Sequence, residues 1–313
     1  MLACVSASAA DAQGFPTRAI SVVVPYAAGG ALDAVGRVVA DELQQRLKVS
    51  VVVDNRAGGG GVVGMTHVSR SAPDGHTLMI SSETGQAVLP AIDPKFPIDA
   101  LNTFTPISLI GTFPHFVIAR RSLGVNTVPE LIKLARQNPG KLNLGNNGVG
   151  TIAHVGIELL KRKADIDITN VPYRGATAAL SDLIAGTVDT NINSLPVIRG
   201  QLDNPALKIL AILSPERDPR FPDVPTIVEA GLPDLVFVSW TAVFGPAQMQ
   251  RDVVERVSTA LVEAVKTPEA SQRLRNVGFE PAGLGAAELD RFQREVAQRW
   301  KAIAQETGIK LQQ

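Results

Sequence analysis

The stretch from Val22 to Asp33 joins a buried strand to an amphipathic helix through a glycine turn. Its three successive valines are typical of a strand, and Gly29 and Gly30 precede the apolar positions of the helix. The first four N–H groups of a helix have no acceptor within the helix, and the aligned peptide dipoles place partial positive charge there. A carboxylate or phosphate can bind at such an end without a lysine. The stretch therefore predicts an anion site.

A second junction of the same kind lies further along the chain. Leu142 to Leu144 is predicted as a short strand, and Gly145, Gly148 and Gly150 lead from it to a helix that begins near Thr151. Threonine is a favourable residue at the N-terminus of a helix. Two glycine-rich helix starts, far apart in the sequence, indicate two lobes that close on one small anion.

Strand and helix patterns alternate along the whole chain. The predicted strands are Ile20 to Val24, Val49 to Asp54, Thr77 to Ser81, Leu142 to Leu144, Ile168 to Val171, Val188 to Ile192, Leu207 to Leu213 and Leu235 to Phe244. The predicted helices are Ala31 to Leu47, Val62 to Ser71, Thr127 to Asn138, Ile152 to Lys163, Ala178 to Ala185, Thr226 to Ala230, Val253 to Val265, Glu269 to Asn276 and Ala287 to Glu306. This order predicts an α/β fold of two doubly wound lobes.

Two extended segments lie on either side of the second α/β series. The first, around Pro106 to Ala119, lies in a stretch predicted to be broken by Gly111 and Pro114, and the second is around Phe237 to Phe244. If both cross between the lobes, residues 14–113 and 235–313 form a discontinuous first lobe and residues 114–234 form the second, with a two-stranded hinge. The length of 313 residues fits two domains of about 150 residues each. Ligands of open α/β sheets bind beyond the carboxyl ends of the strands, where both glycine turns lie.

The charge balance argues against nucleic acid as a partner. Lys and Arg together number 30, as do Asp and Glu, and aromatic residues make up 4% of the chain. No basic field attracts a phosphate backbone, and few rings are available for stacking on bases. No apolar run approaches the ~20 residues that span a bilayer. An anion site in this chain must be local.

The first residues resemble the end of an export signal. Met1 to Gly14 is small and apolar, and Ala10-Asp11-Ala12 before Gln13 fits the small-x-small rule of signal-peptide cleavage. We expect residues 1–13 to be a truncated signal and the mature protein to be periplasmic. A disordered cytosolic tail and a lipid-modified Cys4 stay open as alternatives. As the single cysteine, Cys4 cannot form an internal disulfide.

Several motifs, in order along the chain, resemble the Bug family of periplasmic solute receptors, the binding components of tripartite tricarboxylate transporters. They are Phe15-Pro16, Val24 to Asp33, Asp54 to Gly58 with Gly61 and Gly64, Pro73 to Leu78, Asp99 with Phe104 to Ile107, Val171 to Gly175, and Leu183 to Asp189. The resemblance implies a two-lobed flytrap that captures a small organic carboxylate and delivers it to membrane transporter subunits. It also implies that the receptor is a monomer, has no cofactor and is not an enzyme.

The resemblance also implies which residues bind the ligand. They are Tyr26, Ala28, Gly29, Gly30, Ala31, Ser81, Ser82, Asn147, Gly148, Gly150, Thr151, Tyr173, Arg174, Asn193 and Ser194. Among these, Arg174 is the candidate for a side-chain clamp, because a guanidinium forms a planar fork that matches a carboxylate. A surface ion pair is the alternative role for Arg174. Bulky substitution at Gly30 or Gly148 is expected to abolish binding and to leave the fold intact.

Three positions depart from the family pattern. Val62 stands where asparagine is typical, Glu83-Thr84-Gly85 replaces smaller residues, and Asn193 stands where aspartate is frequent. Glu83 can repel a dicarboxylate or pair with an ammonium or amide group. A neutral Asn193 instead fits a ligand without a cationic group, so Glu83 and Asn193 favour different ligands.

The main competing hypothesis is a nucleotide-dependent oxidoreductase. Gly59 to Gly64 has the glycine spacing of a dinucleotide-binding turn, and Glu83 lies ~20 residues on, where a ribose-binding acid belongs. Against it, Asp54 to Ala57 lengthens the connection between the strand and the glycines. A domain that binds no ligand is the third possibility.

The sequence offers little for catalysis or metal binding. It contains no Gly-x-Ser-x-Gly elbow and no zinc-protease helix. The four histidines, His67, His76, His115 and His154, lack metal-ligand spacing. We therefore expect a binding protein without a metal.

Overall fold

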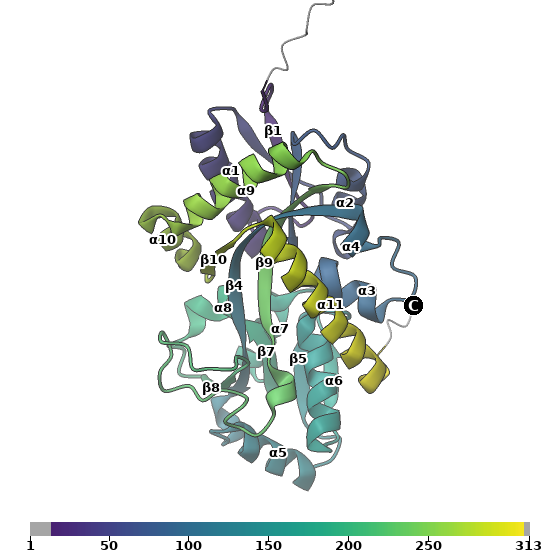
Figure 1. The fold of residues 1–313 in the computed structure, drawn as a ribbon. Coiled ribbons are helices and arrows are strands. Elements are labelled where there is room, and N and C mark those ends of the chain that lie inside the picture. The colour runs from purple at the N-terminus through teal and green to yellow at the C-terminus, as the bar shows by residue number, and fades with distance from the viewer. Residues whose placement is uncertain (1–13, 310–313) are drawn as a thin grey trace, which may run out of the picture.

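Two long strands connect the two lobes in the computed structural model, which describes residues 14–309. The predicted signal, residues 1–13 with Cys4, lies outside them. Strand β4 (Phe104–Arg120) runs from one lobe to the other (Figure 1). It is antiparallel to β9 (Val238–Pro246) as far as Pro114, and from His115 it is antiparallel to β7 (Thr190–Ser194). The predicted break in β4 is wrong: the strand continues, and a register shift against β9 lies between Leu109 and Gly111.

The first lobe is built on a mixed sheet. Its strands follow the order β2-β1-β3-β9-β4, parallel from β2 to β3 and antiparallel from there on, and β10 pairs with β4. Its other strands are β1 (Ile20–Val24), β2 (Val51–Asn55), β3 (Thr77–Ser82) and β10 (Glu280–Leu284). Its helices are α1 (Ala31–Leu47), α2 (Val62–Ser69), α3 (Leu89–Ile92), α4 (Ala100–Thr103), α9 (Arg251–Lys266), α10 (Pro268–Asn276) and α11 (Ala286–Thr307), with short turns η1 (Gly59–Gly61) and η2 (Thr84–Val88).

The second lobe continues the same sheet from the far part of β4. The order runs β4-β7-β5-β6, with β8 paired to β4. Its other strands are β5 (Asn143–Asn146), β6 (Thr169–Pro172) and β8 (Leu207–Ile212). Its helices are α5 (Val128–Gln137), α6 (Ile152–Ala164), α7 (Ala176–Ala185) and α8 (Leu195–Ile198), with short turns η3 (Arg121–Leu123), η4 (Arg199–Gln201) and η5 (Pro233–Leu235).

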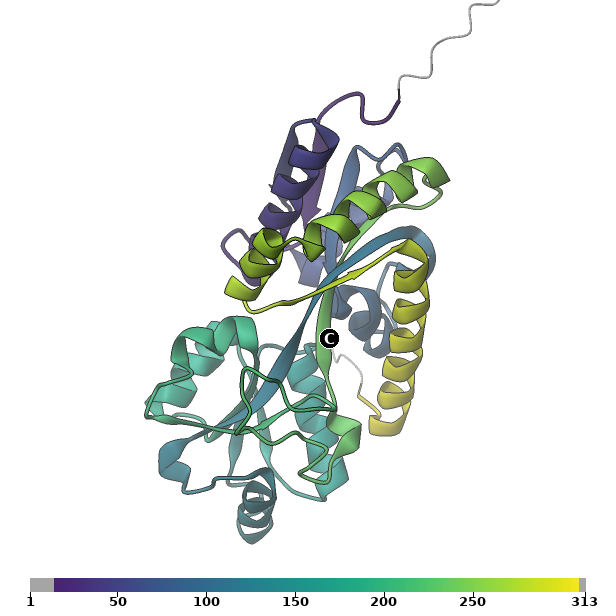
Figure 2. The same cartoon turned by 60° about the vertical axis from the view of Figure 1, so that its left-hand side comes forward.

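The C-terminal helix α11 ties the lobes together on one side. Figure 2 shows α11 running along one side of the molecule, and its Phe292 ring packs against Trp240 of β9 with centroids 5.7 Å apart. Its Trp300 is 1% exposed, belongs to the apolar core of the second lobe, and stacks on Phe237 with ring centroids 5.3 Å apart. A helix that starts in the first lobe thus contributes to the core of the second.

Most predicted elements are confirmed, with shifted ends, and a few are wrong. The predicted helix at Thr226 to Ala230 is a single hydrogen-bonded turn, because Gly231 adopts a φ of +83° directly after it. The sequence analysis missed β10, which contains a proline and a glycine, and the helical turns η2 and α3. The lobe boundaries at 113/114 and 234/235 stay predictions. No helix within residues 14–309 is long and apolar enough to cross a membrane.

The contact of α1 with the sheet yields a stability prediction. A Cβ on Gly36 of α1 would lie only 2.7 Å from Cγ2 of Val24 in β1. We expect Gly36→Val to lower the free energy of unfolding by about 1–3 kcal/mol, the usual cost of overpacking. Gly200→Val is the control, because a Cβ there meets no atom within 4 Å. Urea denaturation measures both, and a Gly36→Val midpoint equal to that of Gly200→Val would contradict the prediction.

Candidate functional site

A cavity of about 700 Å³ lies between the lobes, beside the strands that join them. The first lobe lines it with Tyr26, Ala27, Ala28, Gly29, Gly30, Ala31, Leu32, Ser82, Glu83, Thr84 and Phe279. The second lobe lines it with Asn147, Thr151, Ile152, Ala153, Gly175, Ala176, Thr177 and Ser194. The connecting strands contribute Phe113, His115 and Ser239. Both glycine turns predicted from the sequence therefore reach one cavity.

In the first lobe, the N-terminus of α1 faces this cavity. No side chain caps the helix at Gly30. Asp33 instead holds the preceding turn, because its carboxylate accepts hydrogen bonds from the Gly29 N–H at 2.9 Å, from Asn55 at 3.0 Å and from Arg37 at 3.1 Å. Burial raises the pKa of Asp33, but these hydrogen bonds and the charge of Arg37 outweigh burial and lower the pKa overall. Asp33 is thus a charged support for the turn rather than a cavity residue.

In the second lobe, two helices begin at the cavity. Thr151 caps α6 by accepting from the His154 N–H, and its hydroxyl donates to the Gly148 carbonyl at 2.7 Å. Helix α7 begins after Gly175, which has a φ of +123° and provides no side-chain cap. The N-termini of α1, α6 and α7 therefore converge, and each brings partial positive charge to the same cavity.

The connecting strands place a polar group at the cavity. Phe113 and His115 lie on the same face of β4, two residues apart, and Phe113 is paired with Ser239 of β9. His115 Nε2 lies 2.7 Å from Ser239 Oγ. Burial lowers the pKa of His115 to about 4, so the imidazole is neutral at physiological pH.

Glu83 completes this polar group. It is 5% exposed, and its Oε1 accepts a hydrogen bond of 2.6 Å from Trp300 Nε1. Burial raises the pKa of Glu83 to about 7, although the Trp300 hydrogen bond, the charge of Arg299 and the nearby Ser239 hydroxyl lower it in part. Within the described part of the chain, Oε2 of Glu83 has no hydrogen-bond partner of normal geometry.

No Lys or Arg is among the described residues that line this cavity. Anion binding here depends on backbone N–H groups and helix dipoles, with hydroxyl groups as further donors. Arg199 lines a neighbouring hollow of about 630 Å³, which shares Gly29, Gly30 and Ala31 with the cavity.

The structure brings together nine of the fifteen predicted binding residues. Those that line the cavity are Tyr26, Ala28, Gly29, Gly30, Ala31, Ser82, Asn147, Thr151 and Ser194. Those that lie off the lining are Ser81, Gly148, Gly150, Tyr173, Arg174 and Asn193.

Most of the residues off the lining are engaged in local structure. Ser81 accepts from Gln86 at 3.0 Å, and Tyr173 donates to Asp182 at 2.7 Å. Asn193 donates to the Ala176 carbonyl at 3.2 Å. Arg174, in contrast, is exposed.

The sequence analysis missed several residues at the cavity. Phe113, His115 and Ser239 come from the connecting strands, Gly175 to Thr177 opens α7, and Phe279 precedes β10. Alternation along β4 is the signal that would have found Phe113 and His115 together, since residues two apart face the same side of a strand.

The Gly59 to Gly64 turn lies behind the cavity. A Cβ on Gly61 would meet the Tyr26 hydroxyl at 3.4 Å, and one on Gly64 would meet Cα of Pro25 at 2.8 Å. These glycines allow close packing under the Tyr26 loop, and Glu83 binds Trp300 instead of standing free for a ribose. This packing contradicts the dinucleotide-binding alternative.

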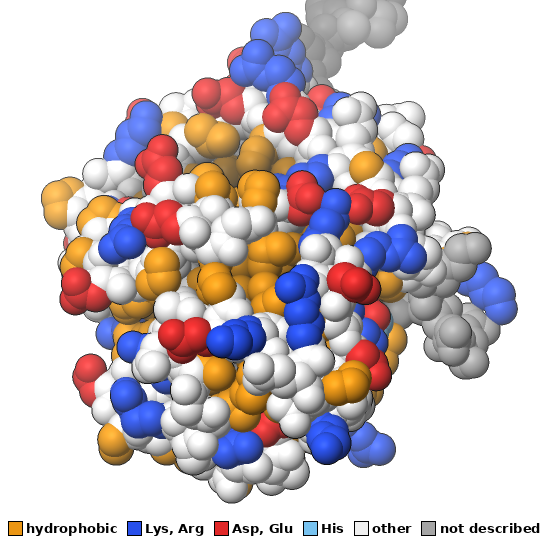
Figure 3. Space-filling view, turned by 90° about the horizontal axis from the view of Figure 1, so that it is seen from below, with side chains coloured by type: hydrophobic (Ala, Val, Ile, Leu, Met, Phe, Trp, Pro, Cys, Tyr) orange, Lys and Arg blue, Asp and Glu red, His pale blue; other side chains and the backbone are white. Residues whose placement is uncertain are grey.

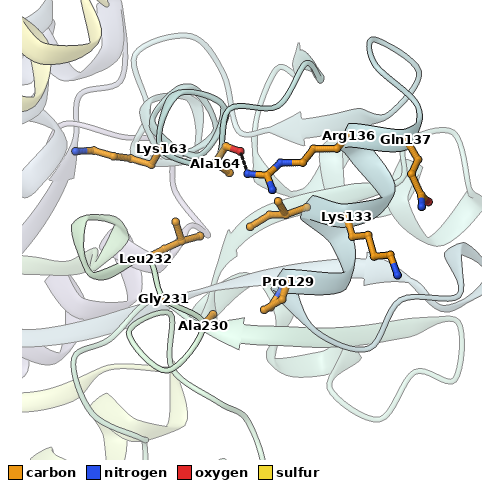
Figure 4. A pocket seen from close by; sticks show the side chains of 10 residues that line it. Pro129, Lys133, Arg136, Gln137, Lys163, Ala164, Ala230, Gly231 and Leu232 are labelled. Atoms are coloured by element: carbon orange, nitrogen blue, oxygen red, sulfur yellow. Dashed lines mark hydrogen bonds between the residues drawn. The ribbon is translucent and has the colours of Figure 1, made fainter.

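A separate hollow of about 490 Å³ lies on the second lobe (Figure 4). It is lined by Lys133 and Arg136 of α5, by Lys163 of α6 and by residues 230–232. Arg136 donates to the Ala164 carbonyl, and Lys163 pairs with Asp234 and Glu306. The cations of this hollow are therefore largely engaged, and it is remote from the helix N-termini described above.

The surface carries charges of both signs. Seen from the end of the molecule where the second lobe lies, Lys and Arg are interspersed with Asp and Glu (Figure 3). Among the described residues, no group of three or more His, Cys, Asp or Glu is placed to hold a metal ion.

Comparison with known proteins gives a consistent picture. Residues 35–309 match the model of the tripartite tricarboxylate transporter family receptor. The UPF0065 protein in the tcbD-tcbE intergenic region of a Pseudomonas species is 37% identical over 302 residues, which cover 96% of this chain and 89% of that protein.

Solved structures agree with this match. Rpa4515 from R. palustris, solved with adipate, superposes with a TM-score of 0.86 at 31% identity and covers 95% of this chain and 99% of its own. The periplasmic binding protein BugD has a TM-score of 0.82 at 28% identity, over 95% and 100% of the two chains.

The raised pKa of Glu83 yields a prediction for stability against pH. The folded-state pKa of about 7 lies above the reference value of 4.5, so the protonated carboxyl stabilises the fold fully below pH 4.5, and this stabilisation is lost as the pH rises through 7. Because glutamine does not ionise, Glu83→Gln does not lose stability in this pH range. The stability of Glu83→Gln relative to wild type should therefore increase between pH 5 and pH 8, by at most about 1.4 kcal/mol per pH unit.

Urea denaturation at several pH values measures the difference. Glu295→Gln, at an exposed position of α11, is the matched control. Parallel pH profiles for wild type and Glu83→Gln would contradict the prediction.

Proposed function

The chain belongs to the tripartite tricarboxylate transporter receptor family, and we propose that it captures a small organic carboxylate in the interlobe cavity. The observation that carries this proposal is the convergence of three helix N-termini, those of α1, α6 and α7, on a cavity lined by no cation within the described residues. A carboxylate supplies the acceptors that these N–H groups lack. The resemblance to Bug-type receptors noted in the sequence is confirmed by the family match.

Ligand binding is coupled to closure of the lobes. The ligand contacts α1 from one lobe and α6 and α7 from the other, so it binds the closed form more tightly than an open form that offers only one lobe. Such differential affinity shifts the population toward the closed form. The connecting strands β4 and β9 supply the hinge for this movement.

The direct contacts proposed for the ligand are the predicted residues that line the cavity. In the first lobe they are the backbone of the Tyr26 to Ala31 loop and the Ser82 hydroxyl, and in the second lobe they are Asn147, Thr151 and Ser194. The adipate in the Rpa4515 structure supports a carboxylate as the ligand class. Water can bridge such a group to amides beyond direct reach.

The proposed setting is the periplasm. Family members include the periplasmic binding protein BugD, and the predicted export signal of this chain, residues 1–13, agrees with that location. The proposed partners are the membrane subunits of a tripartite tricarboxylate-type transporter, to which the monomeric receptor presents its closed form. We propose no enzymatic activity and no nucleic-acid partner.

Filling the cavity at Gly30 tests the function. Gly30 lines the cavity and has a φ of −81°, which any residue can adopt. The atom nearest to a Cβ added at Gly30 is the Ala27 carbonyl oxygen, at 3.5 Å, so a side chain can be added there without a clash at its Cβ. We expect Gly30→Leu to abolish carboxylate binding because the side chain occupies the ligand space beside α1. Calorimetry and thermal shift with mono-, di- and tricarboxylates, and with NAD and NADP, measure the effect; a ligand at 100 times its Kd stabilises by about 2.7 kcal/mol.

Gly30→Ala is the matched control and should bind nearly as wild type does. Gly148 is a poorer test than the sequence suggested, because its φ of +125° and the Tyr173 carbonyl 3.2 Å from an added Cβ make any substitution strain the loop. Stabilisation of wild type by NAD and by no carboxylate, or unchanged affinity in Gly30→Leu, would contradict the proposed function.

The clamp role of Arg174 stays a prediction. The guanidinium is exposed and off the cavity lining, one residue before the Gly175 turn that opens α7. If lobe closure brings it onto the ligand, Arg174→Ala weakens carboxylate binding about tenfold or more, the cost of losing a charge-assisted hydrogen bond. Calorimetry with the carboxylate that binds wild type measures this. Unchanged affinity would assign Arg174 to the surface.

A further inference from the structure

Glu83 is the one acidic side chain among the described residues that line the cavity. It follows β3 directly and is fixed from behind by Trp300 of α11. The hydrogen bond from Trp300 occupies Oε1 and leaves Oε2 without a normal partner. A buried oxygen of this kind carries the cost of lost hydration until a donor reaches it.

No cation of the protein lines the cavity to satisfy this carboxylate. Arg299 lies on the other side of Glu83, in a hollow of about 220 Å³ shared with Trp300 and Phe237. Its guanidinium donates to the Val236 carbonyl and lies 5.8 Å from the centre of the Phe237 ring. His115, the other titratable group beside Ser239, is neutral. Apart from the Ser239 hydroxyl, which lies near enough to lower the pKa of Glu83, the described lining offers this carboxylate no charged donor, so a ligand in the cavity can supply one.

The opposite lobe also presents an unpartnered acceptor. The Oδ1 atom of Asn147 is buried and has no hydrogen-bond partner in the described structure. The helix N-termini supply donors, while Glu83 and Asn147 supply acceptors. The cavity thus suits a ligand with an anionic group and, separately, a group rich in N–H donors.

A second carboxylate is unfavourable at Glu83. Two ionised carboxylates in a site of low dielectric repel each other strongly, and one of them must take up a proton for both to remain. An ammonium has the opposite sign and three donors, so it satisfies Oε2 and neutralises the charge. Phe113 and Phe279, which also line the cavity, tolerate a cation over their ring faces.

We propose that Glu83 determines the specificity of this receptor and that the preferred ligands are amino carboxylates, with the ammonium group on Glu83 and the carboxylate on the helix N-termini. This inference rests on the proposed carboxylate-binding function and narrows its ligand class. Trp300 is a positioning residue, because its hydrogen bond fixes the carboxylate of Glu83, which lines the cavity.

Matched ligand pairs test the inference by calorimetry. Two pairs, 5-aminopentanoate with glutarate and 6-aminohexanoate with adipate, have equal carbon number, and an aminomethyl group with its ammonium replaces the second carboxylate. Glutamate and glutarate differ by an added α-ammonium. For the amino carboxylates that bind most tightly, the affinity of wild type should be at least about tenfold higher than for the matched dicarboxylates. A tenfold ratio is the contribution of about one charge-assisted hydrogen bond. Glu83→Gln keeps an acceptor for Trp300 and should remove this preference, with weaker binding of the amino carboxylates and tighter binding of the dicarboxylates.

Proton exchange gives an independent readout. An ammonium lowers the pKa of Glu83, so binding at pH 7 should release protons, whereas a second carboxylate raises the pKa and takes protons up. Titrations in buffers of different ionisation enthalpy measure the sign. Glu295→Gln should retain the wild-type preference and proton release.

Three results have distinct meanings. A wild-type preference for the dicarboxylates with proton uptake would overturn the inference. A preference ratio that Glu83→Gln leaves unchanged would also overturn it, with the proposed function intact as long as Gly30→Leu abolishes binding. Failure of every amino carboxylate and every mono-, di- and tricarboxylate to bind wild type would overturn the proposed function itself.

Discussion

The pairing of β4 with different partners along its length governs the rest of this structure. Hydrogen bonds to β9 hold its first part in one lobe, and hydrogen bonds to β7 and β8 hold its second part in the other. The partners of β4 change near Pro114 and His115, and this short stretch is where the proposed rotation of the lobes would occur. Because the cavity lies beside this stretch, a small rotation alters the distance between the helix N-termini that line it. The ladder of β4 therefore fixes both the junction of the lobes and the place of the cavity.

The proposed recognition by backbone amides accounts for how a chain with no net charge can bind an anion. The dipoles of α1, α6 and α7 are fixed by their own helices and need no reorganisation when a ligand arrives. Asp33 strengthens this arrangement, because its carboxylate holds the Gly29 turn from the inside and is itself buried away from the cavity lining. Selectivity among anions then depends on the few side chains that differ from their neighbours in charge, and Glu83 is the clearest of these.

Local sequence signals predicted much of the fold, and the family resemblance pointed to nine of the residues that line the cavity. The glycine turns before α1 and α6 were found because they combine a strand pattern, a positive-φ residue and a helix start within a few positions. The cavity residues His115, Ser239 and Phe279 were not, since each lies in an extended segment whose facing side depends on pairing with distant strands. Trp300 reaches Glu83 across 217 residues of sequence. Contacts of that range leave no local periodicity, so only the folded chain reveals them.

Glu83 and Asn193, the two departures from the family pattern that favour different ligands, have different surroundings in the structure. Asn193 is fully buried; its amide donates to the Ala176 carbonyl, and its oxygen accepts from the Ser194 N–H. Its polar atoms support the α7 and α8 starts from within the second lobe, so its neutrality carries no information about a cationic group on the ligand. Glu83 differs, since Trp300 holds one of its oxygens, the other is buried without a hydrogen-bond partner of normal geometry, and the side chain lines the cavity. Of the two positions, only Glu83 lines the cavity, so only Glu83 supports the proposed preference for a ligand with a cationic group.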